Sequence, residues 1–130
     1  MAHIHSIIVR GFHCDAYGHV NNARYLEFLE ESRWAALETH NLIERVNELG
    51  LQFFVVNINI SFKKALLPND SIHIETKLGE VKRKTISFIQ TISKGEDVAA
   101  AAEVTFVLFD EANKKAATIE ESHVTMFKSF

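Results

Sequence analysis

A single long helical segment constrains the fold of this chain more than any other feature. Residues 22–40 (NARYLEFLEESRWAALETH) contain neither glycine nor proline and are rich in residues that favour helix. At about 100° per residue, the apolar side chains of this segment spread over one broad arc that also includes Ser32. The arc consists of Tyr25, Phe28, Leu29, Ala36 and Leu37. A helix that is apolar over so wide an arc is expected to be largely wrapped by other structure.

One charged residue, Arg33, also falls within this arc. An unpaired charge would be costly to bury there. Glu30 lies three residues earlier at the edge of the arc, so we expect the two side chains to form an ion pair with a structural role. Trp34 falls on the opposite, polar side of the helix.

The rest of the chain supplies the expected wrapping, because most of it has the patterns of β-strands. Strands are predicted over residues 4–12, 53–66, 71–80, 83–95 and 98–110, with turns near Pro68 and Gly79. A short helix is predicted over residues 41–50, ending at Gly50, and a last strand or short helix over residues 115–130. This order predicts an α+β fold, one antiparallel sheet folded around one helix, in a single domain spanning residues 1–130.

Two of these strands carry a period-2 pattern that assigns their faces. In the 53–66 segment one face holds Val56, Ile58, Ile60 and Phe62. The 98–110 segment is rich in alanine, which favours helix, yet its alternation gives an unbroken apolar face, and we therefore predict a strand. That face consists of Val98, Ala100, Ala102, Val104, Phe106 and Leu108.

Composition excludes several classes of protein. The formal net charge is −3, so no overall basic field attracts nucleic acid. The single cysteine, Cys14, excludes an internal disulfide and suits a reducing compartment. The N-terminal residues do not resemble a signal peptide, and no apolar run approaches the ~20 residues that span a bilayer. We therefore expect a cytoplasmic protein with no membrane partner. His3, His5, His13 and His19 lack companion ligands at metal-site spacing, so no metal site is predicted.

The segment in front of the helix, HCDAYGHVNN, crowds reactive groups at residues 13–22. Asn21 and Asn22 are both candidates for the helix N-cap, and Gly18 permits a tight turn that folds Asp15 back toward the helix end. The first amides of a helix lack partners within it and favour negative charge. Two interpretations follow: a capping loop in which Asp15 accepts backbone amides, or an acid–base and oxyanion site for acyl transfer or hydrolysis. A nucleophilic Cys14 paired with a histidine has no identified activating group, which favours an inert cysteine.

The pattern from Asp15 through Gly18-His19-Val20-Asn21-Asn22 to Tyr25 resembles the active-site signature of hotdog-fold thioesterases, relatives of 4-hydroxybenzoyl-CoA thioesterase. The similarity is greatest to bacterial long-chain acyl-CoA thioesterases. It extends to FVVNINISFKKAL and AEVTFVLFD, and so spans nearly the whole chain. The resemblance implies a hotdog fold, in which an antiparallel sheet wraps one long central helix and subunits pair edge to edge. It also implies hydrolysis of acyl-CoA thioesters, with medium- to long-chain fatty acyl-CoA as the expected substrate, to free acid and CoA without a cofactor.

The resemblance implies a role for each matching residue. Asp15 matches the catalytic aspartate, which activates water or attacks the thioester, and the backbone N–H of Asn22 matches the donor that polarises the carbonyl. His19 and Asn21 match positions that shape the loop or contact substrate. Tyr17 stands where plant acyl-carrier-protein thioesterases have asparagine, so their catalytic scheme cannot be transferred whole. Another branch places a catalytic glutamate on the helix, but Asp15 makes that assignment to Glu27, Glu30 or Glu31 unnecessary.

Substrate contacts, rival functions and assembly complete the expectations. The candidates to line an acyl pocket are Phe12, Tyr25, Phe28, Phe53 and Phe54, with Ala100 and Ala102 leaving room. The candidates to hold the CoA phosphates by charge are Lys63, Lys64, Arg83 and Lys84.

Two rival functions stay open: a non-catalytic acyl-thioester binding protein, and an enoyl-thioester hydratase that uses His19. A small sheet with open edges exposes unpaired backbone groups that pairing with a second subunit would satisfy. We therefore expect a homodimer or homotetramer with sites at the subunit boundary.

Overall fold

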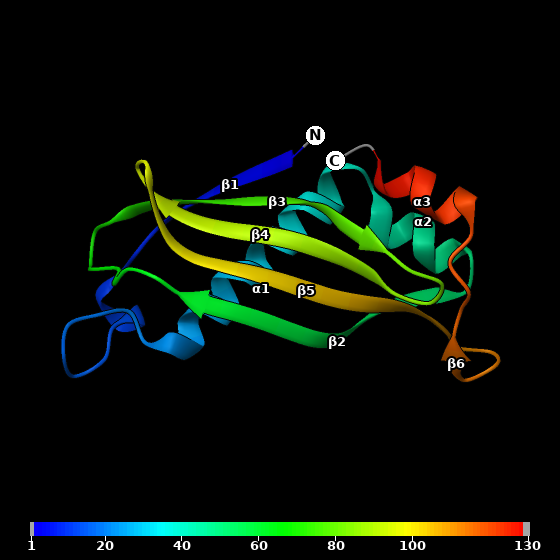
Figure 1. Ribbon diagram of the computed structural model, residues 1–130, viewed down its shortest axis with the longest axis horizontal. Coiled ribbons are helices and arrows are strands. Elements are labelled where there is room, and N and C mark those ends of the chain that lie inside the picture. Colours follow the sequence, from blue (N-terminus) through cyan, green and yellow to red (C-terminus); the bar gives the residue numbers. More distant parts are fainter. Residues whose placement is uncertain (1, 129–130) are drawn as a thin grey trace.

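The long helix predicted from the sequence is present, and an antiparallel sheet curves around it (Figure 1). The computed structural model describes residues 2–128. Its strands are β1 (Ala2–Ile8), β2 (Leu51–Phe62), β3 (Ser71–Val81), β4 (Ile86–Lys94), β5 (Asp97–Asp110) and β6 (Lys115–Ala116). Its helices are a 3-10 turn (Gly11–His13), α1 (Asn22–Thr39), α2 (Leu42–Glu48) and α3 (Glu121–Phe127). Residues 129–130 of the last predicted segment lie outside the described residues.

The strand order β1-β3-β4-β5-β2 places β1 and β2 at opposite edges of the sheet, and β6 pairs with the end of β5. Every strand pair is antiparallel. The helix α1 packs mainly against β1, β3 and α2, which leaves it displaced from β2. The predicted α+β architecture is therefore confirmed, with one edge strand less well covered by the helix than the other.

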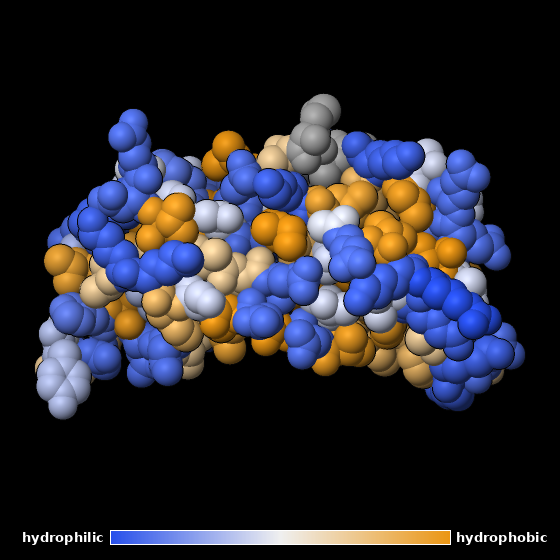
Figure 2. All heavy atoms as spheres, viewed as in Figure 1, coloured by the Kyte–Doolittle hydropathy of each residue, from blue (hydrophilic) through white to orange (hydrophobic). Residues whose placement is uncertain are grey.

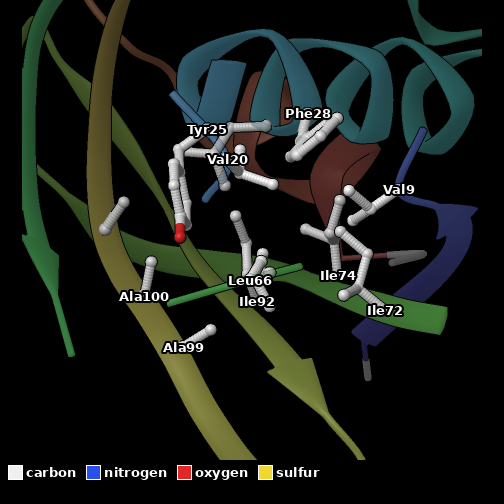
Figure 3. Close-up of a cluster of buried hydrophobic side chains, with 12 residues drawn as sticks. Val9, Val20, Tyr25, Phe28, Leu66, Ile72, Ile74, Ile92, Ala99 and Ala100 are labelled. Carbon is white, nitrogen blue, oxygen red and sulfur yellow. The ribbon is translucent and has the colours of Figure 1, made fainter. Parts of the chain in front are cut away.

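The apolar arc of α1 faces the sheet as predicted. Its buried residues are Tyr25, Phe28, Leu29, Ser32, Ala36 and Leu37. The first three of these belong to one core cluster, in which Tyr25 and Phe28 point down onto Val20, Leu66 and the strands (Figure 3). Ala36 and Leu37 belong to a second cluster that also contains Phe88, Phe106 and Phe127. The sheet and helix thus enclose two apolar clusters that follow one another along α1.

A layer of buried hydrogen bonds lies between the two clusters. The Ser32 hydroxyl bonds the Thr76 hydroxyl at 3.1 Å, and both residues are fully buried. The amide of Gln90, also fully buried, donates to Thr76 Oγ1 at 2.9 Å and to the carbonyl of Leu29 at 3.1 Å. Arg33 Nη1 donates to Gln90 Oε1 at 3.1 Å. We refer to this set as the polar layer.

The polar layer corrects the predicted ion pair between Arg33 and Glu30. Within residues 2–128 no ion pair joins them, and the hydrogen-bond partner of the guanidinium is Gln90 instead. Glu30 is exposed and lies near Arg33 without forming an ion pair with it. A buried neutral amide that is itself hydrogen-bonded on both sides satisfies part of the arginine without burying a second charge.

Several predicted boundaries also differ. The first strand ends at Ile8 rather than residue 12, because Val9 turns away to pair its backbone with Asn69 and Asp70. β2 ends at Phe62 rather than residue 66. Gly79 lies inside β3 and not in a turn; the hairpin closes instead where Lys82 N bonds Thr85 O at 2.8 Å.

Bulges change the predicted faces of the two alternating strands. In β5 the register shifts near Ala99, so Ala99 and Ala100 are both buried while Val98 is 40% exposed, which removes Val98 from the predicted apolar face. In β2 Val56 is the extra residue of a bulge. Beyond it Ile58, Ile60 and Phe62 oppose buried residues of β5 and share its inner face, as predicted.

Several apolar residues of β2 remain uncovered. Val56 is 56% exposed, Phe62 50% and Ile58 36%. Figure 2 shows apolar atoms along the lower rim of the molecule, where β2 runs in Figure 1. We call Val56, Ile58 and Phe62 the β2 edge.

Candidate active site

The loop that precedes α1 is folded back on itself by backbone hydrogen bonds. Asp15 N donates to His19 O at 2.9 Å, and Gly18 N donates to Asp15 O at 3.1 Å. Gly18 has φ +78°, a conformation that glycine adopts without the strain of a side chain. A bridge between Cys14 and Val20 closes the base of the loop. Asp15 and His19 are therefore held on opposite strands of one tight turn.

Asn21 is the N-cap of α1, and Asn22 is its first helical residue. Asn21 Oδ1 accepts Ala23 N at 3.0 Å, the Asn21 carbonyl accepts Arg24 N at 2.9 Å, and Asn21 N donates to His13 O at 2.9 Å. Within residues 2–128 the backbone N–H of Asn22 has no hydrogen-bond partner. Of the two predicted cap candidates, one thus caps the helix and the other presents its unpaired amide.

The carboxylate of Asp15 is exposed and is oriented by one backbone contact. Its Oδ1 accepts the amide of Tyr17 at 2.9 Å, the pattern of an Asx-turn. In the described part of the chain, its second oxygen has no recorded partner. The capping-loop interpretation therefore accounts for one carboxylate oxygen and leaves the other available.

A groove of about 570 Å³ brings together seven of the residues that the sequence singled out. It opens at the start of α1, between the Asp15 turn and the end of β2. The predicted residues that line it are Asp15, Asn22, His19, Asn21, Tyr25, Lys63 and Lys64. Sequence reasoning missed Val20, Phe62 and Ala65 as further lining residues. Phe62 had a usable signal, since it ends the apolar face of β2 directly before the two lysines.

The groove has an aromatic wall and a basic wall. The Tyr25 ring is buried and meets Phe62 edge-on, with ring centroids 5.1 Å apart. Burial raises the pKa of Tyr25, so its hydroxyl stays protonated at neutral pH and donates to Lys64 O at 3.4 Å. Lys64 Nζ forms an ion pair with Asp97 at 2.6 Å. Within residues 2–128 no such partner engages the Lys63 ammonium, which makes it the free cation of the pair.

Other predicted substrate contacts lie elsewhere. Arg83 and Lys84 belong to the β3–β4 turn, at the opposite end of the molecule from the Asp15 loop (Figure 1). Phe12 and Phe28 border a different depression beside His13, and Phe54 stacks on Phe109 at 4.7 Å. Ala100 and Ala102 are core residues. Phe53 lies near the second half of α1, at a pocket separate from the groove.

Rival chemistries find little support among the described residues. Cys14 Sγ faces the Arg10 carbonyl at 3.8 Å, and the nearby His13 accepts the amide of Arg10 at 2.8 Å through Nδ1. Burial and the charge of Arg24 lower the pKa of His13. Over residues 2–128 no cluster of three potential metal ligands occurs. No helix in the same range has the length and apolar character needed to cross a bilayer.

Chemically, the groove combines a carboxylate with a free oxygen, an unpaired amide at a helix N-terminus and one unpaired cation. The carboxylate is equipped to take a proton or to attack a carbonyl, and the amide to stabilise the resulting oxyanion. Such a pair is suited to a carbonyl that enters between them.

Comparisons with known proteins point to the same chemistry. A family model described as the thioesterase-like superfamily matches residues 9–126, which include every residue of the groove. The long-chain acyl-CoA thioesterase FadM of Escherichia coli (strain K12) is 40% identical over 116 residues, covering 88% of each protein. The acyl-CoA thioesterase YbgC of Haemophilus influenzae is 33% identical over 103 residues, covering 78% of this chain and 76% of that protein. The solved structure of YbaW, a probable thioesterase from Escherichia coli, has a TM-score of 0.90 at 38% identity, covering 95% and 94% of the two chains.

Proposed function

The chain belongs to the thioesterase-like superfamily, and we propose that it hydrolyses medium- to long-chain acyl-CoA using Asp15 and the backbone N–H of Asn22. Its activity as an acyl-CoA thioester hydrolase follows from its similarity to FadM and YbgC over most of each chain. The preference for longer acyl chains is proposed from FadM, whose name specifies long-chain substrates. One observation carries the catalytic assignment: the free carboxylate oxygen and the unpaired amide border the same groove.

Two routes use these same groups. In the first, Asp15 removes a proton from water while the water oxygen attacks the thioester carbon. In the second, the carboxylate attacks directly and forms an anhydride, which water then hydrolyses. In both, the carbonyl oxygen becomes an oxyanion that accepts the Asn22 N–H, and collapse breaks the C–S bond so that CoA leaves as the thiol after protonation. A positioned base contributes about 10²–10⁴-fold, and one oxyanion donor contributes about 2.7–4 kcal/mol.

The basic wall of the groove is proposed to hold the phosphates of CoA. Lys63 is the stronger candidate because its ammonium is free, whereas Asp97 partly neutralises Lys64. Tyr25, with its ring against Phe62, forms the apolar side on which the first carbons of the acyl chain would lie. His19 and Asn21 border the space between the two walls.

The assembly is proposed to be a homodimer, or a tetramer built from dimers, that pairs through β2. The β2 edge combines unpaired backbone groups with apolar side chains that α1 leaves uncovered. Pairing two such edges satisfies the backbone and buries the apolar residues. Because Phe62 belongs both to this edge and to the groove, the groove would then lie at the subunit boundary. The single cysteine fits the reducing environment of the cytoplasm, where we place the protein.

The decisive experiment replaces Asp15 with asparagine and measures thiol release from a panel of acyl-CoAs. Because the amide oxygen of asparagine still accepts Tyr17 N, Asp15→Asn should keep the loop intact and lower kcat by about 10²-fold or more. Glu27→Gln serves as the matched control, since Glu27 is an acid near the start of α1 that does not line the groove and pairs with Arg24. Its kcat should not change.

The product distinguishes this function from its rivals. Mass spectrometry should find free acid and CoA; a hydrated thioester would indicate a hydratase that uses His19, and unchanged substrate would indicate a binding protein. If Asp15→Asn hydrolyses acyl-CoA at the parent rate, the assignment of Asp15 is wrong.

A further inference from the structure

A second pocket lies at the other half of α1, between that helix, α2 and β2. It encloses about 230 Å³, and its lining includes Glu30, Arg33, Trp34, Asn47, Phe53 and Val55. None of these residues borders the groove at Asp15. We call it the Arg33 pocket, and the proposed hydrolysis assigns no role to it.

The guanidinium of Arg33 is fixed in this pocket by the polar layer. Arg33 Nη1 donates to Gln90 Oε1 at 3.1 Å, and Gln90 is itself fully buried and bonded to Leu29 O and Thr76 Oγ1. A guanidinium carries five N–H donors in a rigid plane. Within residues 2–128 Gln90 is the only recorded hydrogen-bond partner of this side chain. Arg33 therefore presents unused donors whose direction is already set.

The charge of Arg33 is only partly compensated. Burial lowers the pKa of Arg33, and the neighbouring Glu30 raises it without restoring its ordinary value. In the described part of the chain, no carboxylate lies within ion-pair distance of the guanidinium. A ligand that brings negative charge and two acceptor oxygens would complete this environment.

Apart from Arg33, the exposed Glu30 and Asn47, the lining of the pocket is apolar. Phe53 and Val55 come from the inner face of β2, and Trp34 comes from α1 with half its surface exposed. A ligand that satisfies both parts needs a carboxylate at one end and a hydrocarbon body at the other. A pocket of about 230 Å³ suits a body of modest length.

We propose that the Arg33 pocket binds an alkyl carboxylate, with both carboxylate oxygens on the guanidinium of Arg33 and the chain against Trp34 and Phe53. This is the chemical class of acid that acyl-CoA hydrolysis releases, so the pocket gives the protein a second contact with its own product class. Binding there does not require Asp15 and is independent of the catalytic proposal.

Trp34 makes the proposal directly measurable, because it is the only tryptophan of the chain. We expect octanoate to change the tryptophan emission saturably in the intact protein, and 1-octanol, which has the same chain without the charge, to bind at least 10-fold more weakly. Asp15→Asn should give the same octanoate titration as the parent protein. Equal binding of octanoate and octanol would overturn the proposal, as would loss of the signal in Asp15→Asn. Absence of any saturable change, for instance because a second copy covers the pocket, would overturn it as well.

Two substitutions of Arg33 separate binding from folding. Arg33→Met should abolish the preference for octanoate over octanol, but it also leaves Gln90 Oε1 without its donor. Arg33→Lys keeps a donor and a positive charge but removes the planar guanidinium fork. Its melting temperature should therefore lie closer to the parent value than that of Arg33→Met, while its affinity for octanoate should still fall at least 10-fold. Parent-like octanoate affinity in a folded Arg33→Lys variant would show that the guanidinium of Arg33 does not bind the carboxylate through its planar fork.

Discussion

At the scale of single residues, the unpaired amide of Asn22 offers the sharpest test of the catalytic arrangement. Proline lacks this N–H and is well tolerated at the first position of a helix. The preceding Asn21 has φ −60° and ψ 137°, which are angles that a residue before proline adopts readily. Asn22→Pro should therefore leave α1 folded and lower kcat by about 10²–10³-fold, measured as thiol release from acyl-CoA.

The control for this substitution is Asn22→Ala, which removes the side chain and keeps the amide. It should retain parent-like kcat, because the proposed donor belongs to the backbone. Circular dichroism checks that both variants keep their helix. A folded Asn22→Pro enzyme with full activity would exclude this amide as the oxyanion donor.

Sequence analysis grouped residues that are near one another in the chain more easily than distant ones. Asp15, His19, Asn21 and Asn22 come from the loop and helix start that carry the signature, and all four line the groove. The partner of Arg33 was predicted wrongly, because periodicity within a helix suggests only neighbours three or four residues away. Gln90 lies 57 positions further along the chain, and its contact depends on how the sheet is assembled.

At the scale of secondary structure elements, Gly79 shows how closely two strands approach. A Cβ at this position would lie 2.6 Å from Ser87 Oγ and 3.1 Å from Ile89 Cγ1. Ser87 is buried and its hydroxyl accepts the amide of Glu80 at 2.9 Å, so it cannot simply move aside. We expect Gly79→Ala to lower the free energy of unfolding by about 1–3 kcal/mol in urea titrations.

Gly11→Ala provides the comparison for this prediction, because no atom lies within 4 Å of a Cβ built there. Its stability should stay within about 0.5 kcal/mol of the parent. If the two variants were equally stable, the close approach at Gly79 would have no energetic weight.

The elements themselves followed from their patterns, whereas their irregularities did not. Alternation correctly made the alanine-rich β5 a strand against the helix preference of its alanines. The bulges near Ala99 and at Val56 insert one residue without leaving a mark in the pattern, and so Val98 was assigned to the wrong face. Glycine at position 79 suggested a turn, although in a strand glycine also occurs where a neighbouring group comes close, and here the side chains of Ser87 and Ile89 do so.

At the scale of the whole molecule, the two edge strands allow a matched test of assembly. Val56 on β2 is 56% exposed, and Ile4 on β1 is 64% exposed. A lysine in an edge that pairs with another subunit opposes association. We expect Val56→Lys to produce monomers with reduced thioesterase activity and Ile4→Lys to leave the assembly unchanged, as measured by light scattering after size exclusion. Dimeric Val56→Lys would place the interface elsewhere.

The polar layer determines the position of α1 along its own axis. Apolar contacts tolerate sliding, but the bonds from Ser32, Arg33 and the Leu29 carbonyl to Thr76 and Gln90 do not. A slip of one helical turn, about 5.4 Å, would break all three at once and leave buried groups unsatisfied. These mid-helix bonds fix the position of α1 along its axis. They keep the first turn of the helix, some ten residues away, at a constant height above the lysines that follow β2.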